Sequence, residues 1–371
     1  MKILHIITDT NIGGAGKQLL ATLRYLNYDD IDIVVALPCG SAMIPLLSDI
    51  PVRVICMKHG HDRSFDISSV KEISDIIKAE KPDIVHTHAC LSGRIASYIC
   101  RVPSRIMTRH CAFENPKSMM HFPVKNINGI MNNALSTRFI ATAEIAKTRL
   151  IEVGCDKDKI SVVLNGSERV RLTSNSERKE LLSSLNIPGG AFVVGIAARL
   201  EVYKGHKYLL YAASTMRDKP IYFLIIGDGS ERERLVGLAL SLGISDKIIF
   251  TGFVNDVAPY YNIMDVSVNC SYGAETTPLA ITEPMSIGVP NIVTRSGGNA
   301  DIVTDGCDGF VVPECDSDAI AKKIIHLYNN RALKNALGEN AKRTYEMRFC
   351  AEKMAERIME IYREEAKRIG L

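Results

Sequence analysis

The most suggestive chemistry in the sequence belongs to two glutamates that lie eight residues apart, Glu275 and Glu283. Pro278 stands between them, at a position where a helix can begin without losing a hydrogen bond. Glu275 is therefore expected in the loop before this helix, and Glu283 in its second turn. Paired carboxylates accept hydrogen bonds from hydroxyl groups and suit a polyhydroxylated ligand, whereas the alternative is that both are solvated helix charges. Free backbone N–H groups in the loop and the first helical turn could bind an anion. This segment comprises Thr276, Thr277, Pro278 and Leu279.

Two basic residues, Arg199 and Lys204, follow the apolar run 192–198, which is expected to be a strand. Cations at the carboxyl end of a parallel strand suit a diphosphate, because they neutralise its charge through charge-assisted hydrogen bonds. The alternative is an ordinary solvated loop, and charge alone favours that alternative.

A third candidate, His110, follows the expected strand 105–108. A histidine at this place can donate to a developing charge or bind a sugar hydroxyl, although a lone histidine is more often structural or exposed. His86 and His88 alternate at the end of another expected strand. Because no third ligand lies near them in the sequence, we expect no metal site there.

A glycine-rich turn follows the first expected strand and opens a helix, with Gly13 and Gly14 at its centre. It lacks the first glycine and the hydroxyl residue of a P-loop, and it does not match the GxGxxG pattern. Its backbone N–H groups can still approach an anion at the helix N-terminus. A plain tight turn between strand and helix is at least as good an interpretation.

The strands and helices that must hold these residues are expected to alternate along the whole chain. Short β-branched runs follow helix-period segments in both halves, which is typical of parallel α/β architecture. Two doubly wound sheets in tandem would place the carboxyl ends of their strands at a shared cleft. The polar stretch 167–180 is interpreted as the linker between them. The expected strands cover residues 2–8, 31–37, 52–56, 83–87, 105–108, 138–142, 161–164, 192–198, 222–227, 247–251, 266–269, 291–294 and 309–312.

The composition excludes several classes of protein. The chain has 371 residues, of which 46% are hydrophobic and 23% charged, so it has enough apolar surface for two cores and is not disordered. A net charge of +3 argues against a strongly basic nucleic-acid binder. The ten cysteines form no CxxC pair, and no apolar run reaches the length of a membrane span. These features predict reduced thiols and a cytosolic protein, held at most to a membrane surface.

One segment, residues 87–138, is unusually basic, with seven Arg or Lys residues and a single Glu. Apolar residues such as Met119, Met120, Phe122 and Ile127 are interleaved with this charge. The combination favours contact with an anionic membrane surface or a phosphate-bearing acceptor. A solvated basic face is an equally weighted alternative.

Taken together, and in their order along the chain, the candidate residues and motifs resemble those of the family 4 glycosyltransferases. The resemblance covers essentially the whole chain. The GT-B fold of that family implies two Rossmann-like doubly wound domains that face each other across a cleft. Residues 1–166 would form an acceptor-binding domain and residues 167–351 a nucleotide-sugar-binding domain, with a final helix at 352–371 packing back on the first. The motifs that carry the resemblance are Glu275 and Glu283 followed by Gly288-Val289-Pro290, then Arg199 with Lys204-Gly205, and Gly252-Phe253-Val254 before Tyr260-Tyr261.

The resemblance implies a role for each candidate side chain. Glu275 would contact the transferred sugar and Glu283 the nucleotide ribose. Arg199 and Lys204 would hold the donor diphosphate and stabilise the leaving group, and His110 would bind the donor sugar near the reacting carbon. The remaining donor-binding positions are Gly13, Gly14, Gly227, Phe253, Val254, Thr276, Thr277, Pro278 and Leu279.

The implied reaction moves a hexose-type sugar from a nucleotide sugar, with UDP favoured, to a glycan or lipid-linked acceptor in surface polysaccharide or glycoconjugate biosynthesis. The resemblance implies retention of anomeric configuration. Neither a metal nor another cofactor is expected, because fixed cations can balance the diphosphate. The enzyme would lie in the cytoplasm or on the inner face of the plasma membrane, without a nucleic-acid partner. Two alternatives remain, a catalytically silent nucleotide-sugar-binding partner of another transferase and a nucleotide-sugar epimerase of the same fold.

Overall fold

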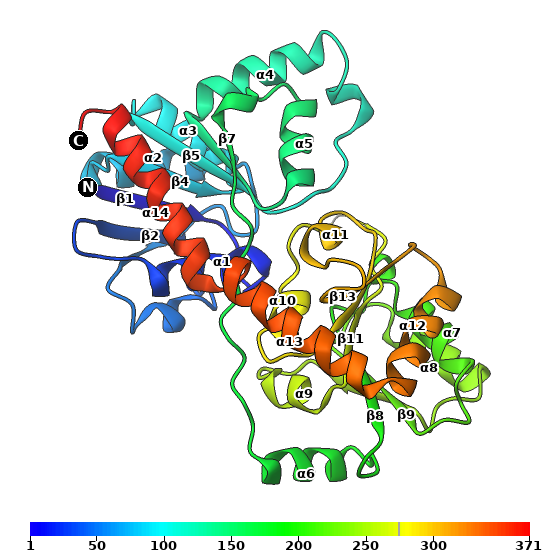
Figure 1. Cartoon of the computed structure of the whole chain (residues 1–371). Coiled ribbons are helices and arrows are strands. Elements are labelled where there is room, and N and C mark those ends of the chain that lie inside the picture. Colours follow the sequence, from blue (N-terminus) through cyan, green and yellow to red (C-terminus); the bar gives the residue numbers. More distant parts are fainter. Residues whose placement is uncertain (274) are drawn as a thin grey trace. The chain divides into compact units, whose positions relative to one another are not determined.

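The computed structural model describes residues 1–273 and 275–371, which form two compact units. Unit 1 consists of Met1–Gly166 together with Ala351–Leu371, and unit 2 consists of Ser167–Cys350. The chain therefore leaves the first unit after Gly166 and contributes its last helix to that unit (Figure 1).

Unit 1 is built on a seven-stranded parallel sheet in the order β3-β2-β1-β4-β5-β6-β7. This order places a topological switch point between β1 and β4, the usual ligand position in doubly wound sheets. The strands are β1 (Lys2–Ile7), β2 (Asp32–Pro38), β3 (Arg53–Met57), β4 (Ile84–His88), β5 (Ser104–Arg109), β6 (Arg138–Ala141) and β7 (Ile160–Val162).

Helices cover both faces of this sheet because alternate strand residues point to opposite sides. In β1, Ile3 and Ile7 pack in the cluster that includes residues of α1 and α14, whereas Leu4 and Ile6 pack with residues of α2 and α3. The helices of unit 1 are α1 (Gly14–Tyr25), α2 (Ile67–Glu80), α3 (Leu91–Ile99), α4 (Val124–Leu135), α5 (Glu144–Glu152) and α14 (Ala351–Arg368), with 3-10 turns η1 (Ile44–Leu47), η2 (Lys117–Met119) and η3 (Lys157–Lys159).

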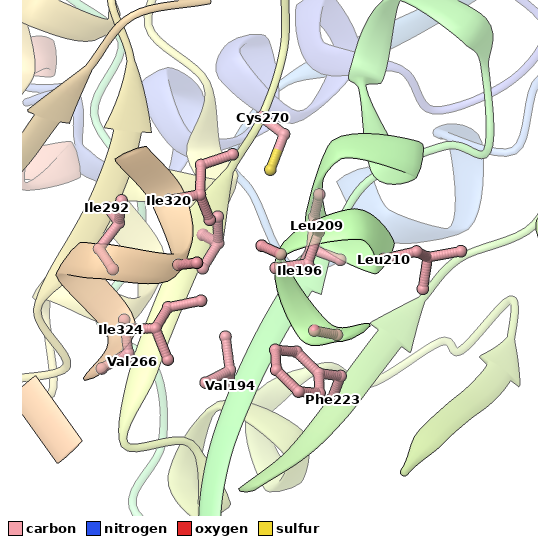
Figure 2. Packing of buried hydrophobic residues seen from close by; sticks show 14 of the residues in the cluster. Val194, Ile196, Leu209, Leu210, Phe223, Val266, Cys270, Ile292, Ile320 and Ile324 are labelled. Carbon is pink, nitrogen blue, oxygen red and sulfur yellow. The ribbon is translucent and has the colours of Figure 1, made fainter. Parts of the chain in front are cut away.

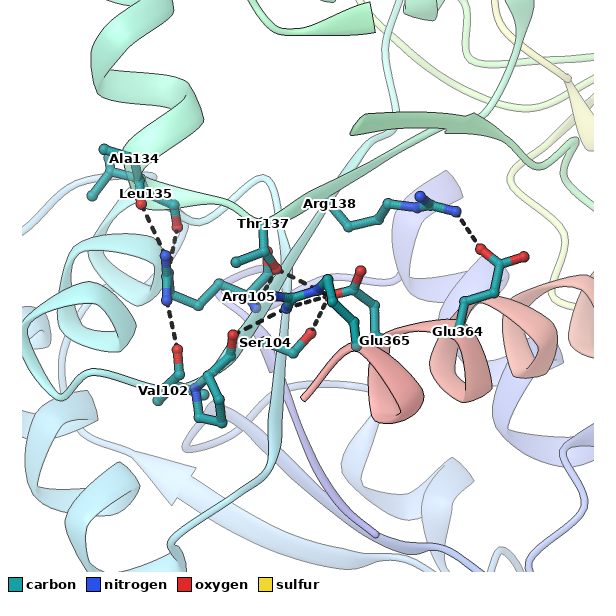
Figure 3. Close-up of polar contacts among 11 residues, drawn as sticks. Val102, Ser104, Arg105, Ala134, Leu135, Thr137, Arg138, Glu364 and Glu365 are labelled. Atoms are coloured by element: carbon teal, nitrogen blue, oxygen red, sulfur yellow. Dashed lines mark hydrogen bonds and ion pairs between the residues drawn. The ribbon is translucent and has the colours of Figure 1, made fainter. Parts of the chain in front are cut away.

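Polar contacts add to the apolar packing of α14 on unit 1 (Figure 3). The carboxylate of Glu365 accepts hydrogen bonds from Ser104 at 2.7 Å and Thr137 at 3.1 Å, at the start of β5 and just before β6. Burial opposes ionisation of Glu365, but hydrogen bonds from Arg368 and Ser104 outweigh it and keep its pKa below the usual value. Glu364 also pairs with Arg138. The last helix is thus held to the sheet by both kinds of contact.

Unit 2 contains a six-stranded parallel sheet in the order β10-β9-β8-β11-β12-β13, with its switch point between β8 and β11. Val194 and Ile196 of β8 pack with Phe223 and with residues of the flanking helices, as Figure 2 shows. The strands are β8 (Phe192–Ala197), β9 (Ile221–Ile226), β10 (Ile248–Gly252), β11 (Val266–Asn269), β12 (Asn291–Thr294) and β13 (Gly309–Val312). The helices are α6 (Asn175–Ser184), η4 (Val202–Lys204), α7 (His206–Ser214), α8 (Arg232–Ser241), α9 (Ala258–Ile263), α10 (Leu279–Met285), α11 (Asn299–Ile302), α12 (Ser317–Asn329) and α13 (Arg331–Arg348).

The prediction that residues 167–180 form a linker is wrong for residues 175–180, which belong to α6. Ser174 and Glu177 form a capping box that starts α6, and the backbone N–H of Val170 donates to Ser286 at 3.0 Å. The stretch is polar because it lies on the surface of unit 2, and its S-x-x-E spacing was the overlooked helix signal.

Candidate functional site

The switch point of unit 2 brings together two residues that lie far apart in the sequence. Lys204 lies in the loop after β8, Glu275 in the loop after β11, and these strands are neighbours in the sheet. Nζ of Lys204 is 2.5 Å from Oε1 of Glu275, and the Ser271 hydroxyl donates to the same oxygen at 2.6 Å. The side chain of Glu275 is almost fully buried. A cation and a carboxylate thus meet where doubly wound sheets bind ligands.

Two glycines allow these loops to approach each other. Gly205, directly after Lys204, has φ +72°, and a Cβ there would lie 2.1 Å from the carbonyl oxygen of Cys270. Gly297, after β12, has φ +50°, and a Cβ there would lie 2.2 Å from the carbonyl oxygen of Glu275. A side chain at either position would strain its own backbone and displace a loop that holds the ion pair.

Tyr203 links the second predicted cation to the first. Nη2 of Arg199 donates to the Tyr203 hydroxyl at 3.0 Å, and Nζ of Lys204 lies 5.3 Å from the centre of the same ring. Arg199 is exposed, whereas Lys204 is largely buried. Tyr203 was not among the predicted site residues, although an aromatic residue between two cations was a usable signal.

Glu283 lies in α10, in its second turn as predicted, and is held by a buried tyrosine. The hydroxyl of Tyr261 donates to Oε2 of Glu283 at 2.9 Å. Burial raises the pKa of Tyr261 well above its usual value, and the negative charge of Glu283 adds to this effect. The tyrosine therefore stays protonated and acts as a donor. Tyr261 had been noted only as part of a motif, without a role.

The other predicted positions of unit 2 lie in loops that follow its strands. Gly227 follows β9 and its N–H donates to the carbonyl of Gly252, so the ends of β9 and β10 are joined. Phe253, the next residue, is 76% exposed, whereas Val254 packs partly into an apolar cluster. The loop before α10 runs from the buried Thr276 and Thr277 to Pro278, the N-cap of the helix, and Leu279, its first residue.

Three of the predicted residues, Gly13, Gly14 and His110, belong to unit 1. Gly13 caps the N-terminus of α1 and Gly14 begins it, and a Cβ at either position would meet nothing within 4 Å. Neither backbone conformation nor packing therefore requires glycine at these two positions. Both residues are exposed, which leaves room for another group to approach the backbone.

His110 contacts a group of buried histidines. Its Nε2 is 3.0 Å from Nδ1 of His88, and Nε2 of His88 is 3.1 Å from Nδ1 of His5. Nitrogen atoms of His5, His86 and His88 lie within 4.8 Å of one another, so three potential metal ligands do meet here. His5 was missed because it lies on β1, and only strand pairing brings it opposite His86. The expectation of a metal-free enzyme stays a prediction.

The buried histidines predict a loss of stability in mild acid. Burial lowers the pKa of His5 to about 3 and that of His110 to about 4, below the value near 6.5 of an unfolded chain. As the pH falls below about 6.5, these histidines bind protons in the unfolded chain but stay neutral in the folded chain. Each of them therefore lowers the free energy of unfolding by about 1.4 kcal/mol per pH unit. We expect the melting temperature of unit 1 to be highest above neutral pH and to fall steadily towards pH ~5.

Thermal unfolding followed by circular dichroism at a series of pH values checks this expectation. A melting temperature that stays constant through this pH range would contradict the buried, neutral state of the histidines.

Comparison with known proteins adds a family assignment to this geometry. The model for "Glycosyltransferase Family 4" matches residues 12–170, and the model for "Glycosyl transferases group 1" matches residues 177–344. A D-inositol 3-phosphate glycosyltransferase of Corynebacterium urealyticum is 30% identical over 76% of this chain and 71% of its own length. A capsular polysaccharide biosynthesis glycosyltransferase, CapM of Staphylococcus aureus, is 27% identical over 97% of this chain and 96% of its own.

A third relative and two solved structures are also similar. The Escherichia coli UDP-Gal:α-D-GlcNAc-diphosphoundecaprenol α-1,3-galactosyltransferase is 28% identical over 80% of this chain and 79% of its own. A crystal structure of a glycosyltransferase from Rickettsia africae matches with a TM-score of 0.86 at 22% identity, over 99% of this chain and 98% of its own. Anabaena HepE in complex with UDP matches with a TM-score of 0.84 at 24% identity, over 98% of this chain and 100% of its own.

Proposed function

The chain belongs to the family 4 glycosyltransferases and has their GT-B fold, and on this premise we propose that it transfers a hexose from a UDP-sugar to a glycan or lipid-linked acceptor. The observation that carries the proposal is the Lys204–Glu275 ion pair at the switch point of unit 2. Its two members offer what a sugar diphosphate needs, namely a cation for the phosphate and a carboxylate for hydroxyl groups. The family assignment favours transfer over the epimerase and silent-partner alternatives.

In the proposed reaction, Lys204 and Arg199 stabilise the leaving diphosphate. The bond between the anomeric carbon and the phosphate oxygen breaks, so negative charge grows on the diphosphate and positive charge on the sugar. Fixed cations lower the energy of that state without a metal ion. Lys204 exchanges its contact with Glu275 for a phosphate oxygen, which frees the Glu275 carboxylate to accept hydrogen bonds from the sugar. Glu283, held by Tyr261, accepts from the ribose.

Retention of configuration is part of the proposal. A carboxylate that accepts several hydrogen bonds is a weak nucleophile, and with donor bound Glu275 would accept from the Ser271 hydroxyl and from the sugar. We therefore favour a route without a covalent intermediate, in which the leaving group departs and the acceptor hydroxyl attacks on the same face of the sugar. The acceptor oxygen forms the new bond to the anomeric carbon, and its proton passes to the departing phosphate oxygen. The anomeric configuration of the product, read from its proton NMR coupling constant, decides this point.

The printed names of the relatives support the proposed donor base and acceptor. HepE was solved with UDP and with UDP-glucose, and the name of the E. coli relative specifies UDP-Gal and a diphosphoundecaprenol-linked acceptor. CapM acts in capsular polysaccharide biosynthesis. These names support a UDP-sugar donor, a lipid-linked or glycan acceptor and a place in surface polysaccharide synthesis. All ten cysteines are free thiols, which supports a cytoplasmic location.

Thermal unfolding with UDP, GDP, ADP or CDP tests the donor assignment. We expect UDP alone to raise the melting temperature of unit 2, because a ligand at 100 times its dissociation constant stabilises the folded state by about 2.7 kcal/mol. The shift should disappear in Lys204→Met and persist in Lys207→Met, which removes a neighbouring cation. A shift with GDP alone would overturn the choice of base, and no shift with any nucleotide would count against the donor site.

Membrane contact through the basic segment 87–138 is a separate part of the proposal. No helix within residues 1–273 and 275–371 is long and apolar enough to cross a bilayer. The segment from η2 through α4 nevertheless exposes large apolar side chains, with Phe122 82%, Ile127 61% and Ile130 73% accessible. Lys117 and Lys125 lie among them. Apolar side chains beside lysines suit the headgroup region of an anionic bilayer.

Sedimentation with phosphatidylglycerol vesicles tests this surface. We expect the wild-type protein to bind at low salt and Ile127→Glu/Ile130→Glu to bind at least ~10-fold more weakly, because two apolar side chains lose their burial and two negative charges are added. Leu240→Glu, at an exposed apolar position of unit 2, should bind like the wild type. No binding of the wild type at low salt would remove this part of the proposal.

A further inference from the structure

A continuous chain of buried polar side chains runs through unit 1, on the sheet face that α14 covers. Strand pairing assembles it, since His5 lies opposite His86 in the β1–β4 register and His88 lies opposite Thr108 in the β4–β5 register. We call this chain the histidine relay. Its members, in the order of their contacts, are His110, His88, His5, Tyr362, His86 and Thr108.

The first part of the relay leads from His110 to α14. Nε2 of His110 is 3.0 Å from Nδ1 of His88, and Nε2 of His88 is 3.1 Å from Nδ1 of His5. Nε2 of His5 is 3.2 Å from the hydroxyl of Tyr362, which lies on α14. Both ring nitrogens of His88 and of His5 therefore take part in hydrogen bonds.

The second part leads from Tyr362 to β5. The Tyr362 hydroxyl is 2.7 Å from Nδ1 of His86, and Nε2 of His86 is 2.6 Å from Oγ1 of Thr108. Thr108 is fully buried. Among the residues that the structure describes, His86 is the one hydrogen-bond partner of its hydroxyl.

All four imidazoles of the relay are neutral near pH 7. Burial brings the pKa of His5 to about 3 and that of His110 to about 4, and it keeps the pKa values of His86 and His88 well below their usual range. A neutral imidazole has one N–H and one lone pair, so a ring that accepts on one side must donate on the other. The buried Tyr362 hydroxyl has one proton, and among the described residues its partners are His5 and His86, so it donates to one ring and accepts from the other. The direction of any single hydrogen bond in the relay therefore determines the direction of all five.

The hydroxyl of Thr108 selects that direction. If Nε2 of His86 donated to Thr108, the buried hydroxyl proton would have no acceptor among the described residues, which is unfavourable. If Thr108 donates to Nε2 of His86, that ring must donate through Nδ1 to the oxygen of Tyr362. The donation then passes from the Tyr362 hydroxyl to His5, from His5 to His88, and from His88 to Nε2 of His110.

We propose that the histidine relay holds His5, His86, His88 and His110 as Nδ1–H tautomers, so that His110 acts as a neutral hydrogen-bond donor through Nδ1. An isolated imidazole in water favours the Nε2–H form, so the relay reverses the ordinary preference. The catalytic consequence rests on the proposed function, because an uncharged donor at His110 suits an oxygen of the donor sugar. Tyr362 acts through the histidines and is a positioning residue, so α14 sets the tautomer of a site residue.

A metal ion bound by His5, His86 and His88 is the competing interpretation. The group of ligands contains no carboxylate or thiolate to balance the charge of a buried dication. A metal would also take nitrogen lone pairs that the relay uses for hydrogen bonds. These points favour the relay, and a stoichiometric metal in the purified protein would overturn it.

Long-range ¹H–¹⁵N NMR of ¹⁵N-histidine-labelled protein tests the proposal directly, because protonated and bare ring nitrogens have widely different shifts. We expect four rings with a protonated Nδ1 and a bare Nε2 near pH 7.5, assigned by single His→Gln variants. An Nε2–H form at any of the four, or shifts typical of metal-bound nitrogen, would overturn the proposal. The measurement needs no substrate, so its outcome for the tautomers does not depend on whether the proposed function is correct.

Tyr362→Phe tests whether the relay acts as a unit. We expect the Nδ1–H population of His110 to fall and kcat to drop several-fold with little change in KM for the donor, because the link between His86 and His5 is lost. Tyr28→Phe removes another tyrosine hydroxyl of unit 1, which donates to the Leu23 carbonyl, and should change neither. Thr108→Val, which removes the selecting hydroxyl, provides a second variant and should shift all four rings. Unchanged ring nitrogen shifts in both variants would overturn the cooperative relay.

Discussion

Replacing Lys204 by methionine is expected to lower the rate of sugar transfer by about 10²–10³-fold, because the variant lacks the cation that meets the leaving diphosphate. The same substitution leaves the buried Glu275 carboxylate without its ion-pair partner, which also destabilises unit 2. Glu275→Gln should reduce transfer comparably, since it removes the carboxylate that the sugar contacts. Both effects are measured with purified protein, as transfer of a radiolabelled sugar and as the thermal unfolding of unit 2.

The double variant Lys204→Met/Glu275→Gln distinguishes the effect of the ion pair on stability from its effect on sugar transfer. With both charges removed, no isolated charge stays buried, so we expect much of the lost stability to return while transfer stays low. Lys207→Met, three residues away on α7, is the matched control and should transfer sugar at nearly the wild-type rate. If Lys204→Met lost stability but retained full turnover, the pair would be structural and the proposed donor site wrong.

Placing a charge on the inner face of α14 is expected to unfold unit 1 selectively. Ile358 is buried against the β1 face of the sheet with other residues of α1 and α14. Ile358→Asp creates a gap and buries a carboxylate, which together should cost at least about 4 kcal/mol, a large share of the stability of an average domain. Calorimetry should show a lower transition temperature for unit 1 and a nearly unchanged transition temperature for unit 2.

Arg363→Asp on the same helix is the matched control. Arg363 is exposed, so the same new residue faces solvent there and should shift the transition by no more than about 0.5 kcal/mol. Equal shifts for both variants would contradict the packing of α14 on unit 1. A loss of both transitions in Ile358→Asp would indicate that the two units unfold together.

The strands and their parallel arrangement were predictable because buried parallel strands consist of short apolar runs. Ile3 to Ile7 and Phe192 to Ala198 each predicted a strand within one or two residues of the observed one. Helix boundaries were harder to predict where surface polarity resembled that of a loop. Residues 175–180 carry almost no apolar periodicity, so only the capping box of Ser174 and Glu177 marked the start of α6.

The types of the candidate residues were readable from the sequence, but their mutual contacts were not. Lys204 and Glu275 had been assigned to separate parts of the ligand, and nothing local predicts that they form an ion pair across 71 positions. The same holds for Tyr203, which joins the two cations, and for Tyr261, which holds Glu283. Such contacts depend on which strands are neighbours in the sheet.

The sequence by itself determined the α/β class, the family and the charged residues of the candidate donor site, because apolar runs, turn glycines and motif spacing are local properties of the chain. Tertiary structure alone decided which of those residues meet. The strand order β8-β11 pairs Lys204 with Glu275, and the register of β1 with β4 places His5 opposite His86. Tyr362 completes the relay from the other end of the chain, since α14 packs on unit 1. Long-range pairing is a property of the folded sheet as a whole, and no short segment encodes it.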